Sequence, residues 1–191
     1  MLKAIELNPK ESMAHYNLGG IFRDLGRLEE AKKSMLKAIE LNPKESMAHY
    51  NLGCILKDLG KLKEAEQSAL EAIELNPNLG KAYFLLSTLG VTTNQKNWEE
   101  YLFNTEILKN KKDINTVDIY FARANILDRK MNYIHSSHMY KEANTLNRRI
   151  YGSNYMQIKK QMENYYKIWQ RIKINQDLQD NMLTNIFIVG L

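Results

Sequence analysis

The chain has 191 residues, of which 44% are hydrophobic and 26% charged, a composition typical of a soluble folded domain and not of a disordered chain. No stretch approaches the roughly 18 consecutive apolar residues of a membrane-spanning helix, and Met1 leads directly into a charged segment, so the sequence predicts neither a membrane protein nor an exported one. The only cysteine, Cys54, has no partner for an intrachain disulfide, which favours a reducing compartment, and we expect a cytoplasmic location.

The formal net charge is +5, and most of the basic excess lies in the later part of the chain. Such an excess can attract an acidic partner, but lysine is also the commonest residue on a solvated helix face. Acidic residues such as Glu99, Glu100 and Asp113 interrupt the basic ones, and the sequence has no arginine-rich arm. We therefore do not expect a nucleic-acid partner.

The first residues of the chain belong to an internal repeat. Residues 1–34 and 35–68 differ at only seven of 34 positions, and a looser third copy begins at Ala69. A fixed period of this length predicts a stack of similar structural units. Because Met1 aligns with Met35, which lies inside the second helix of a unit, residues 1–11 are predicted to be a partial unit that supplies the second helix only.

Each complete unit is predicted to contain two amphipathic helices joined by a turn. Helical spacing of apolar residues places the first helix at about Ser12–Leu25 and the second at about Leu28–Leu41. Gly26 lies between them, where a glycine in the left-handed conformation ends a helix. An Asn-Pro pair closes the second helix, because proline cannot donate to the helix ladder and restricts the residue before it. The three prolines of the chain all occupy this position: Pro9, Pro43 and Pro77.

Small residues recur where the helices must approach closely, at Gly19 and Gly53 in the first helix and at Ala31 and Ala65 in the second. With these residues in place, the units resemble tetratricopeptide repeats. The positions that carry the resemblance are His15, Leu18, Gly19, Phe22, Ala31, Met35, Ala38 and Pro43 in the first unit, and His49, Leu52, Gly53, Leu56, Ala65, Ala69, Ala72 and Pro77 in the second. The histidines replace the usual tryptophan. The resemblance implies an all-α fold, a right-handed superhelical solenoid of antiparallel helix pairs.

Two less regular units follow. The third begins near Gly80, where Ser87 replaces the signature glycine, and the fourth begins near Val117 after about three inserted residues. We therefore predict a solenoid over residues 12–152, with units starting near residues 12, 46, 80 and 117. Residues 153–174 are predicted to form a helix with an aromatic stripe, which caps the stack or offers a binding surface.

In stacked helical hairpins of this kind the first helices line the concave face, so residues one period apart form rows that face a ligand. Asn17 and Asn51 form one such row, and an amide offers the donor and the acceptor that a peptide backbone requires. Similar asparagine ladders in the family imply binding of an extended peptide. The alternative is that each asparagine bonds within its own repeat. The predicted groove residues are Tyr16, Asn17, Gly20, Arg23, Tyr50, Asn51, Cys54, Lys57 and Lys81.

Other chemistry is less well supported by the sequence. A second groove known in the family clamps the C-terminal carboxylate of a chaperone with Lys and Asn residues, but Tyr16 and Gly20 stand at two of the required positions. His135 and His138 lack a third metal ligand, and Cys54 lacks a base partner that the sequence can locate. We therefore expect no metal, no cofactor and no catalytic residues, but a scaffold that binds a protein or peptide.

Residues 175–191 read as a linker and an apolar tail, in which Ile186–Val189 is a short strand pattern followed by Gly190. The tail and the stretch from Asp118 through Asn125 resemble bacterial proteins in which tetratricopeptide repeats precede a sulfotransferase domain. In that family such a strand leads into the loop that binds the 5′-phosphate of phosphoadenosine phosphosulfate. This resemblance implies a second function, the non-catalytic arm of a truncated sulfotransferase that presents substrate to a domain absent here. The alternative is an incidental, unpaired tail.

Overall fold

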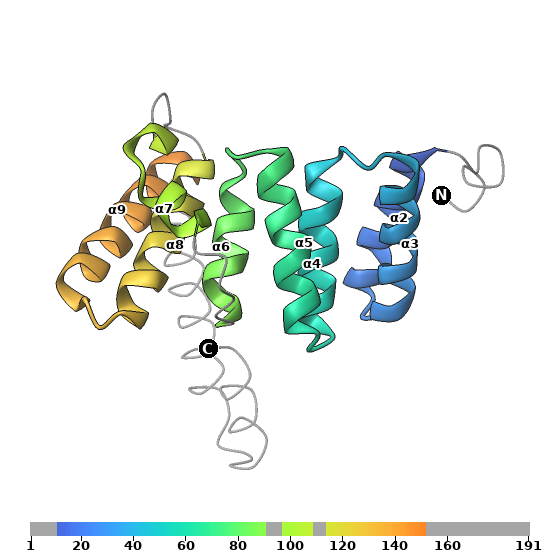
Figure 1. Ribbon diagram of the computed structural model, residues 1–191, viewed down its shortest axis with the longest axis horizontal. Helices are drawn as coiled ribbons and strands as arrows, with labels where there is room; N and C mark the ends of the chain where they lie inside the picture. Colours follow the sequence, from blue (N-terminus) through green and yellow to red (C-terminus); the bar gives the residue numbers. More distant parts are fainter. Residues whose placement is uncertain (1–10, 91–96, 109–113, 152–191) are drawn as a thin grey trace, which may run out of the picture. The chain divides into compact units, whose positions relative to one another are not determined.

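The computed structural model describes residues 11–90, 97–108 and 114–151, and every regular element in these ranges is helical (Figure 1). The chain divides into two compact units, Met1–Ile150 and Tyr151–Leu191, and the described helices belong to the first apart from the last residue of the final helix. Of the helices in the described ranges, none is long and apolar enough to cross a membrane.

Two helical hairpins come first in the described part of the chain. Helices α2 (Ser12–Asp24) and α3 (Leu28–Leu41) form the first hairpin, and α4 (Ser46–Asp58) and α5 (Leu62–Leu75) form the second. The predicted bounds are confirmed to within one residue. Helix α3 also packs against α4, so the two hairpins stack on each other as adjacent repeats (Figure 1).

The turn inside each hairpin requires a left-handed residue. Gly26 has a φ of +72° and Gly60 a φ of +74°, a region in which a residue with a Cβ is strained. The backbone N–H that follows each glycine bonds back into the preceding helix, from Arg27 to the Phe22 carbonyl at 2.8 Å and from Lys61 to the Leu56 carbonyl at 2.8 Å. These bonds satisfy carbonyls that a helix end leaves without a partner.

In two of the first helices, a side chain bonds to the proline carbonyl of the preceding Asn-Pro turn. In α4, His49 Nε2 lies 2.9 Å from the Pro43 carbonyl oxygen and is the donor, because a carbonyl can only accept. In α6 (Gly80–Leu89), Tyr83 occupies the same position and its hydroxyl donates to the Pro77 carbonyl at 3.1 Å. The residue at this position is therefore more than a space-filling substitute for tryptophan.

The third unit is shorter than the first two. Helix α6 ends at Leu89 and is capped by Gly90, whose φ is +65°. Helix α7 (Asn97–Phe103) has only seven residues and is followed by a short 3-10 helix, η1 (Thr105–Leu108). Leu102 and Ile107 are nevertheless both fully buried, whereas Tyr101 is 41% exposed.

The fourth unit consists of α8 (Ile114–Arg129) and α9 (Tyr133–Tyr151). Helix α8 starts three residues before the predicted start at Val117. Two small residues meet where these helices approach, because the hydroxyl of Ser136 donates to the Ala124 carbonyl at 3.1 Å. The predicted partial unit (residues 1–11, apart from Glu11), capping helix (153–174) and tail (175–191) lie outside the described residues.

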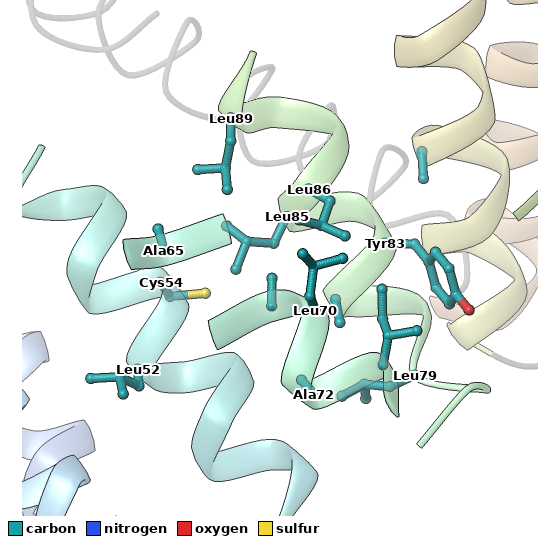
Figure 2. Packing of buried hydrophobic residues seen from close by; sticks show 14 of the residues in the cluster. Leu52, Cys54, Ala65, Leu70, Ala72, Leu79, Tyr83, Leu85, Leu86 and Leu89 are labelled. Atoms are coloured by element: carbon teal, nitrogen blue, oxygen red, sulfur yellow. The ribbon is translucent and has the colours of Figure 1, made fainter. Parts of the chain in front are cut away.

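Close helix packing accounts for the small residues of the repeat (Figure 2). A Cβ on Gly53 would lie 3.0 Å from Leu85 Cδ2 and 3.1 Å from the Ala65 carbonyl oxygen, so neighbours from both α5 and α6 already fill that space. Alanines 65, 69 and 72 of α5 are completely buried beside them. A larger side chain at any of these positions would push helix axes apart.

Candidate functional site

The first helices of successive hairpins lie next to each other, because α2 contacts α4, α4 contacts α6 and α6 contacts α8 (Figure 1). Residues at equal positions of these helices therefore come close together. We call the surface that carries the predicted rows the first-helix face. Among the described residues, hydrogen bonds between side chains of neighbouring first helices join Asn51 to Tyr16, Arg23 to Asp58, Lys57 to Thr88, and Asn125 to Ser87.

The two asparagines of the predicted row have different surroundings. Asn51 Nδ2 donates to the Tyr16 hydroxyl at 2.8 Å, so this amide bonds to the neighbouring repeat and not within its own. Asn17 is exposed, and no hydrogen bond joins its side chain to another described residue. The Asn17 amide is therefore exposed to a ligand, whereas the Asn51 amide is held by its bond to Tyr16.

A cleft of about 670 Å³ opens where α2 and α4 begin. Its lining residues are Glu11, Ser12, Met13, Tyr16, Asn42, Glu45 and Met47. Met13 and Met47 occupy equal positions, one helical turn before Tyr16 and Tyr50, and Met13 is 54% exposed. Flexible thioether side chains adapt to different apolar groups. These methionines are not among the residues predicted for the groove, although their spacing of one period could have identified them.

A polar cluster lies further along the face. Arg23 Nε donates to Asp58 Oδ2 at 2.9 Å, and because both side chains are more than a third exposed, this pair stabilises the fold by little. Burial, followed by the neighbouring Cys54, raises the pKa of Tyr50. Burial also raises the pKa of Cys54, although the nearby Tyr50 and the charge of Arg23 oppose that shift.

The raised pKa of Cys54 predicts slow chemical modification in the folded chain. A thiol with a raised pKa holds less of the reactive thiolate at neutral pH than an ordinary cysteine does, and its reactivity rises only at higher pH. We expect Cys54, which is buried, to react with iodoacetamide at least about tenfold more slowly in the native chain than in urea. Equal rates in the two states, followed by mass spectrometry, would show that the thiol is not shielded.

The remaining predicted residues belong to the same three helices, α2, α4 and α6. A Cβ on Gly20 would meet no atom within 4 Å, which leaves room above this position. Lys57 Nζ donates to the Thr88 hydroxyl at 3.0 Å. Lys81 is exposed on α6 and forms no ion pair with another residue in the described ranges. The nine predicted residues belong to α2, α4 and α6, and one of them, Cys54, is buried.

Aromatic residues extend the row that Tyr16 and Tyr50 begin. Phe84 stands one period after Tyr50 and is 38% exposed, and its ring centroid lies 6.1 Å from that of Phe121 on α8. The Phe121 ring lies 6.3 Å from Tyr140 of α9. Phe84 and Phe121 are not among the residues predicted for the groove, because helical spacing alone does not distinguish an apolar core position from a surface row.

The histidines considered for metal binding have another arrangement. His135 Nδ1 lies 2.8 Å from Asn132 Oδ1 at the start of α9, and both His135 and His138 are exposed. Within the part of the chain that the structure describes, no group of three His, Cys, Asp or Glu side chains could hold a metal ion.

Comparison with known proteins identifies the repeats. Residues 14–45 and 46–79 each match a model of the tetratricopeptide repeat. A search of curated proteins found no match. Among solved structures, YrrB, described as a tetratricopeptide-repeat protein with an unusual peptide-binding site, aligns with a TM-score of 0.52 and 23% identity over 73% of this chain and 74% of its own.

Two structures of MamA align in the same way. One has a TM-score of 0.56 and 19% identity over 77% of this chain and 84% of its own. A second, comprising MamA from residue 41 to its end from Desulfovibrio magneticus RS-1, has a TM-score of 0.53 and 16% identity over 75% and 80% of the two chains. These likenesses confirm the fold, an all-α stack of helix pairs of the tetratricopeptide-repeat type.

Proposed function

Taking as premise that residues 14–79 form two tetratricopeptide repeats, we propose that the chain is a non-catalytic scaffold that binds a peptide segment of a partner protein on its first-helix face. The observation that carries the proposal is the Tyr16–Asn51 hydrogen bond between α2 and α4, since Tyr16 lines a cleft of about 670 Å³ and the next residue, Asn17, is exposed. We expect this scaffold to work in the cytoplasm.

The face has the groups that an extended peptide needs. The Asn17 amide can donate to one backbone carbonyl and accept from one backbone N–H, while the bond from Asn51 holds the Tyr16 hydroxyl in place. Met13 and Met47 line the adjoining cleft and can accommodate an apolar side chain of the same peptide. Polar groups would then fix the peptide backbone, and the cleft would select among side chains.

The charges of the face favour this mode over recognition of a carboxylate. Arg23 is paired with Asp58, so its charge is largely compensated within the chain. Tyr16 and Gly20 replace the basic and amide side chains that a carboxylate clamp requires at those positions. The peptide-binding site named for YrrB supports a peptide ligand by analogy of fold.

Replacing Asn17 and Asn51 together with alanine tests the proposal. Loss of two backbone hydrogen bonds should weaken binding of peptides by about tenfold or more, while the helical circular dichroism signal is retained. The probe is a displayed library of random twelve-residue peptides, selected on the native chain and then measured by fluorescence anisotropy. Asn144→Ala, which removes an exposed asparagine from α9, is the matched control and should leave binding unchanged. Equal binding by the native chain and the double variant would refute the role of this face.

The rival function, the amino-terminal arm of a sulfotransferase, is not supported by the comparisons. The matches extend to the repeats and the fold alone. The Ile186–Val189 strand pattern and Gly190, which suggested the rival, lie outside the described residues.

A further inference from the structure

We propose that a pocket between α5, α6 and α7, separate from the first-helix face, binds the ammonium group of a lysine side chain from another polypeptide. The pocket has a volume of about 350 Å³. The residues that line it are Leu70, Ile73, Glu74, Pro77, Tyr83, Asn97, Trp98 and Tyr101. This combination of apolar, aromatic and acidic groups is suited to a cation on an apolar stem.

The aromatic wall of the pocket is held in place from within the core. The Tyr83 ring is completely buried, and its hydroxyl is fixed by the bond to the Pro77 carbonyl. Tyr101 stacks on it, with ring centroids 6.3 Å apart and planes within 9° of parallel, yet remains 41% exposed. Trp98 is half-buried against the same core. The π faces of such rings attract a cation, and tryptophan does so most strongly.

Glu74 is the only charged residue among those that line the pocket in the described part of the chain. Its side chain is exposed and makes no ion pair with another described residue. The pocket at the first hairpin is different, because its lining mixes Glu29 and Glu40 with three lysines. An unbalanced carboxylate next to aromatic rings favours a positively charged ligand over a neutral or acidic one.

The internal repeat shows which group Glu74 lacks. Glu40 occupies the equal position in the first unit, and Lys37 Nζ donates to its carboxylate at 2.7 Å. In the second unit the residue equal to Lys37 is Glu71, whose carboxylate oxygen lies 2.9 Å from His49 Nδ1. The lysine that neutralises the glutamate in one copy is thus missing from the other, and a lysine from a partner can take its place at Glu74.

Titration with small lysine compounds tests the site directly. The chain has two tryptophans, so replacing Trp169 with phenylalanine leaves Trp98 as the single fluorescent reporter. The probe is Nα-acetyl-lysine methylamide, and the same compound acetylated on Nε is the neutral comparison. We expect the charged probe to change Trp98 emission and the indole N–H chemical shift, and the neutral one to bind at least about tenfold more weakly.

Variants separate the proposed contacts from general effects. Glu74→Gln should lower the affinity for the charged probe about tenfold. Glu40→Gln, the same change at the equivalent position of the first unit, should leave this affinity unchanged. Tyr101→Leu should also lower the affinity for the charged probe. Thermal unfolding checks that each variant is folded. Equal affinity of the charged and neutral probes, or no effect of Glu74→Gln, overturns the proposal. Binding of tetramethylammonium without binding of the lysine probe would overturn the assignment to lysine.

Discussion

Replacing Gly80 with alanine is expected to lower the free energy of unfolding by about 2 kcal/mol, because a Cβ at this position has no room. The added atom would collide with the Asn115 carbonyl oxygen and would lie 3.0 Å from the Asp118 Cβ, both at the beginning of α8. Since the first of these atoms belongs to the backbone of a helix, it cannot move aside as a flexible side chain can. Urea unfolding followed by circular dichroism measures the loss.

Gly20→Ala is the matched control for this prediction. Gly20 also lies in a first helix, but an added Cβ would meet nothing within 4 Å. Alanine in a helix interior is more favourable than glycine by roughly 0.5–1 kcal/mol, so this variant should be slightly more stable than the native chain. Equal stabilities of the two variants would contradict the close approach of α6 and α8.

Replacing Arg123 with methionine is expected to lower the free energy of unfolding by about 2–3 kcal/mol and to release α7. Arg123 is buried in α8, where its Nε donates to the Leu102 carbonyl at 2.8 Å and a terminal nitrogen donates to the Asn104 carbonyl at 3.0 Å. Burial lowers the pKa of this guanidinium. Its removal takes one donor from each of two carbonyls at the end of a seven-residue helix.

Amide hydrogen exchange locates the effect of this substitution. Protection should fall most over α7 and η1, while α2 and α3 exchange as in the native chain, because repeats contact mainly their neighbours. Arg149→Met is the control, since Arg149 is exposed on α9 and its removal should change stability by no more than about 0.5 kcal/mol. If protection from hydrogen exchange fell equally in all helices, Arg123 would have no local role.

The first two units could be predicted from the sequence because each structural signal occurs twice. Gly26 and Gly60 mark the same turn, and the Asn-Pro pairs mark the same helix end, so the spacing of 34 residues confirms each element independently. The start of α8 was placed three residues too late. Asn115 and Thr116 do not continue an apolar pattern, so helical spacing does not place them in α8. The backbone of Asn115 fits beside α6 because Gly80 has no Cβ.

Sequence spacing predicted the positions of the site residues better than their contacts. Equal spacing in the sequence was sufficient to place Asn17 and Asn51 on one face, since adjacent first helices contact each other. It did not predict that the Asn51 amide would bond to Tyr16, because that pairing depends on how far one helix is shifted along its neighbour. Phe84 was likewise missed, because exposure is a property of the packed helices and not of the spacing.

The near identity of the first two units makes the length of this protein adjustable in steps of 34 residues. Removing residues 35–68 would join Ser34 of α3 to Ala69 of α5. The resulting helix would have the first half of α3, which pairs with α2, and the second half of α5, which packs against α6. Unequal recombination between the two copies in the gene would therefore lose or gain one hairpin without requiring a new interface. Each such event would shorten or lengthen the proposed binding surface by one row of side chains, while the packing between neighbouring helices stays the same.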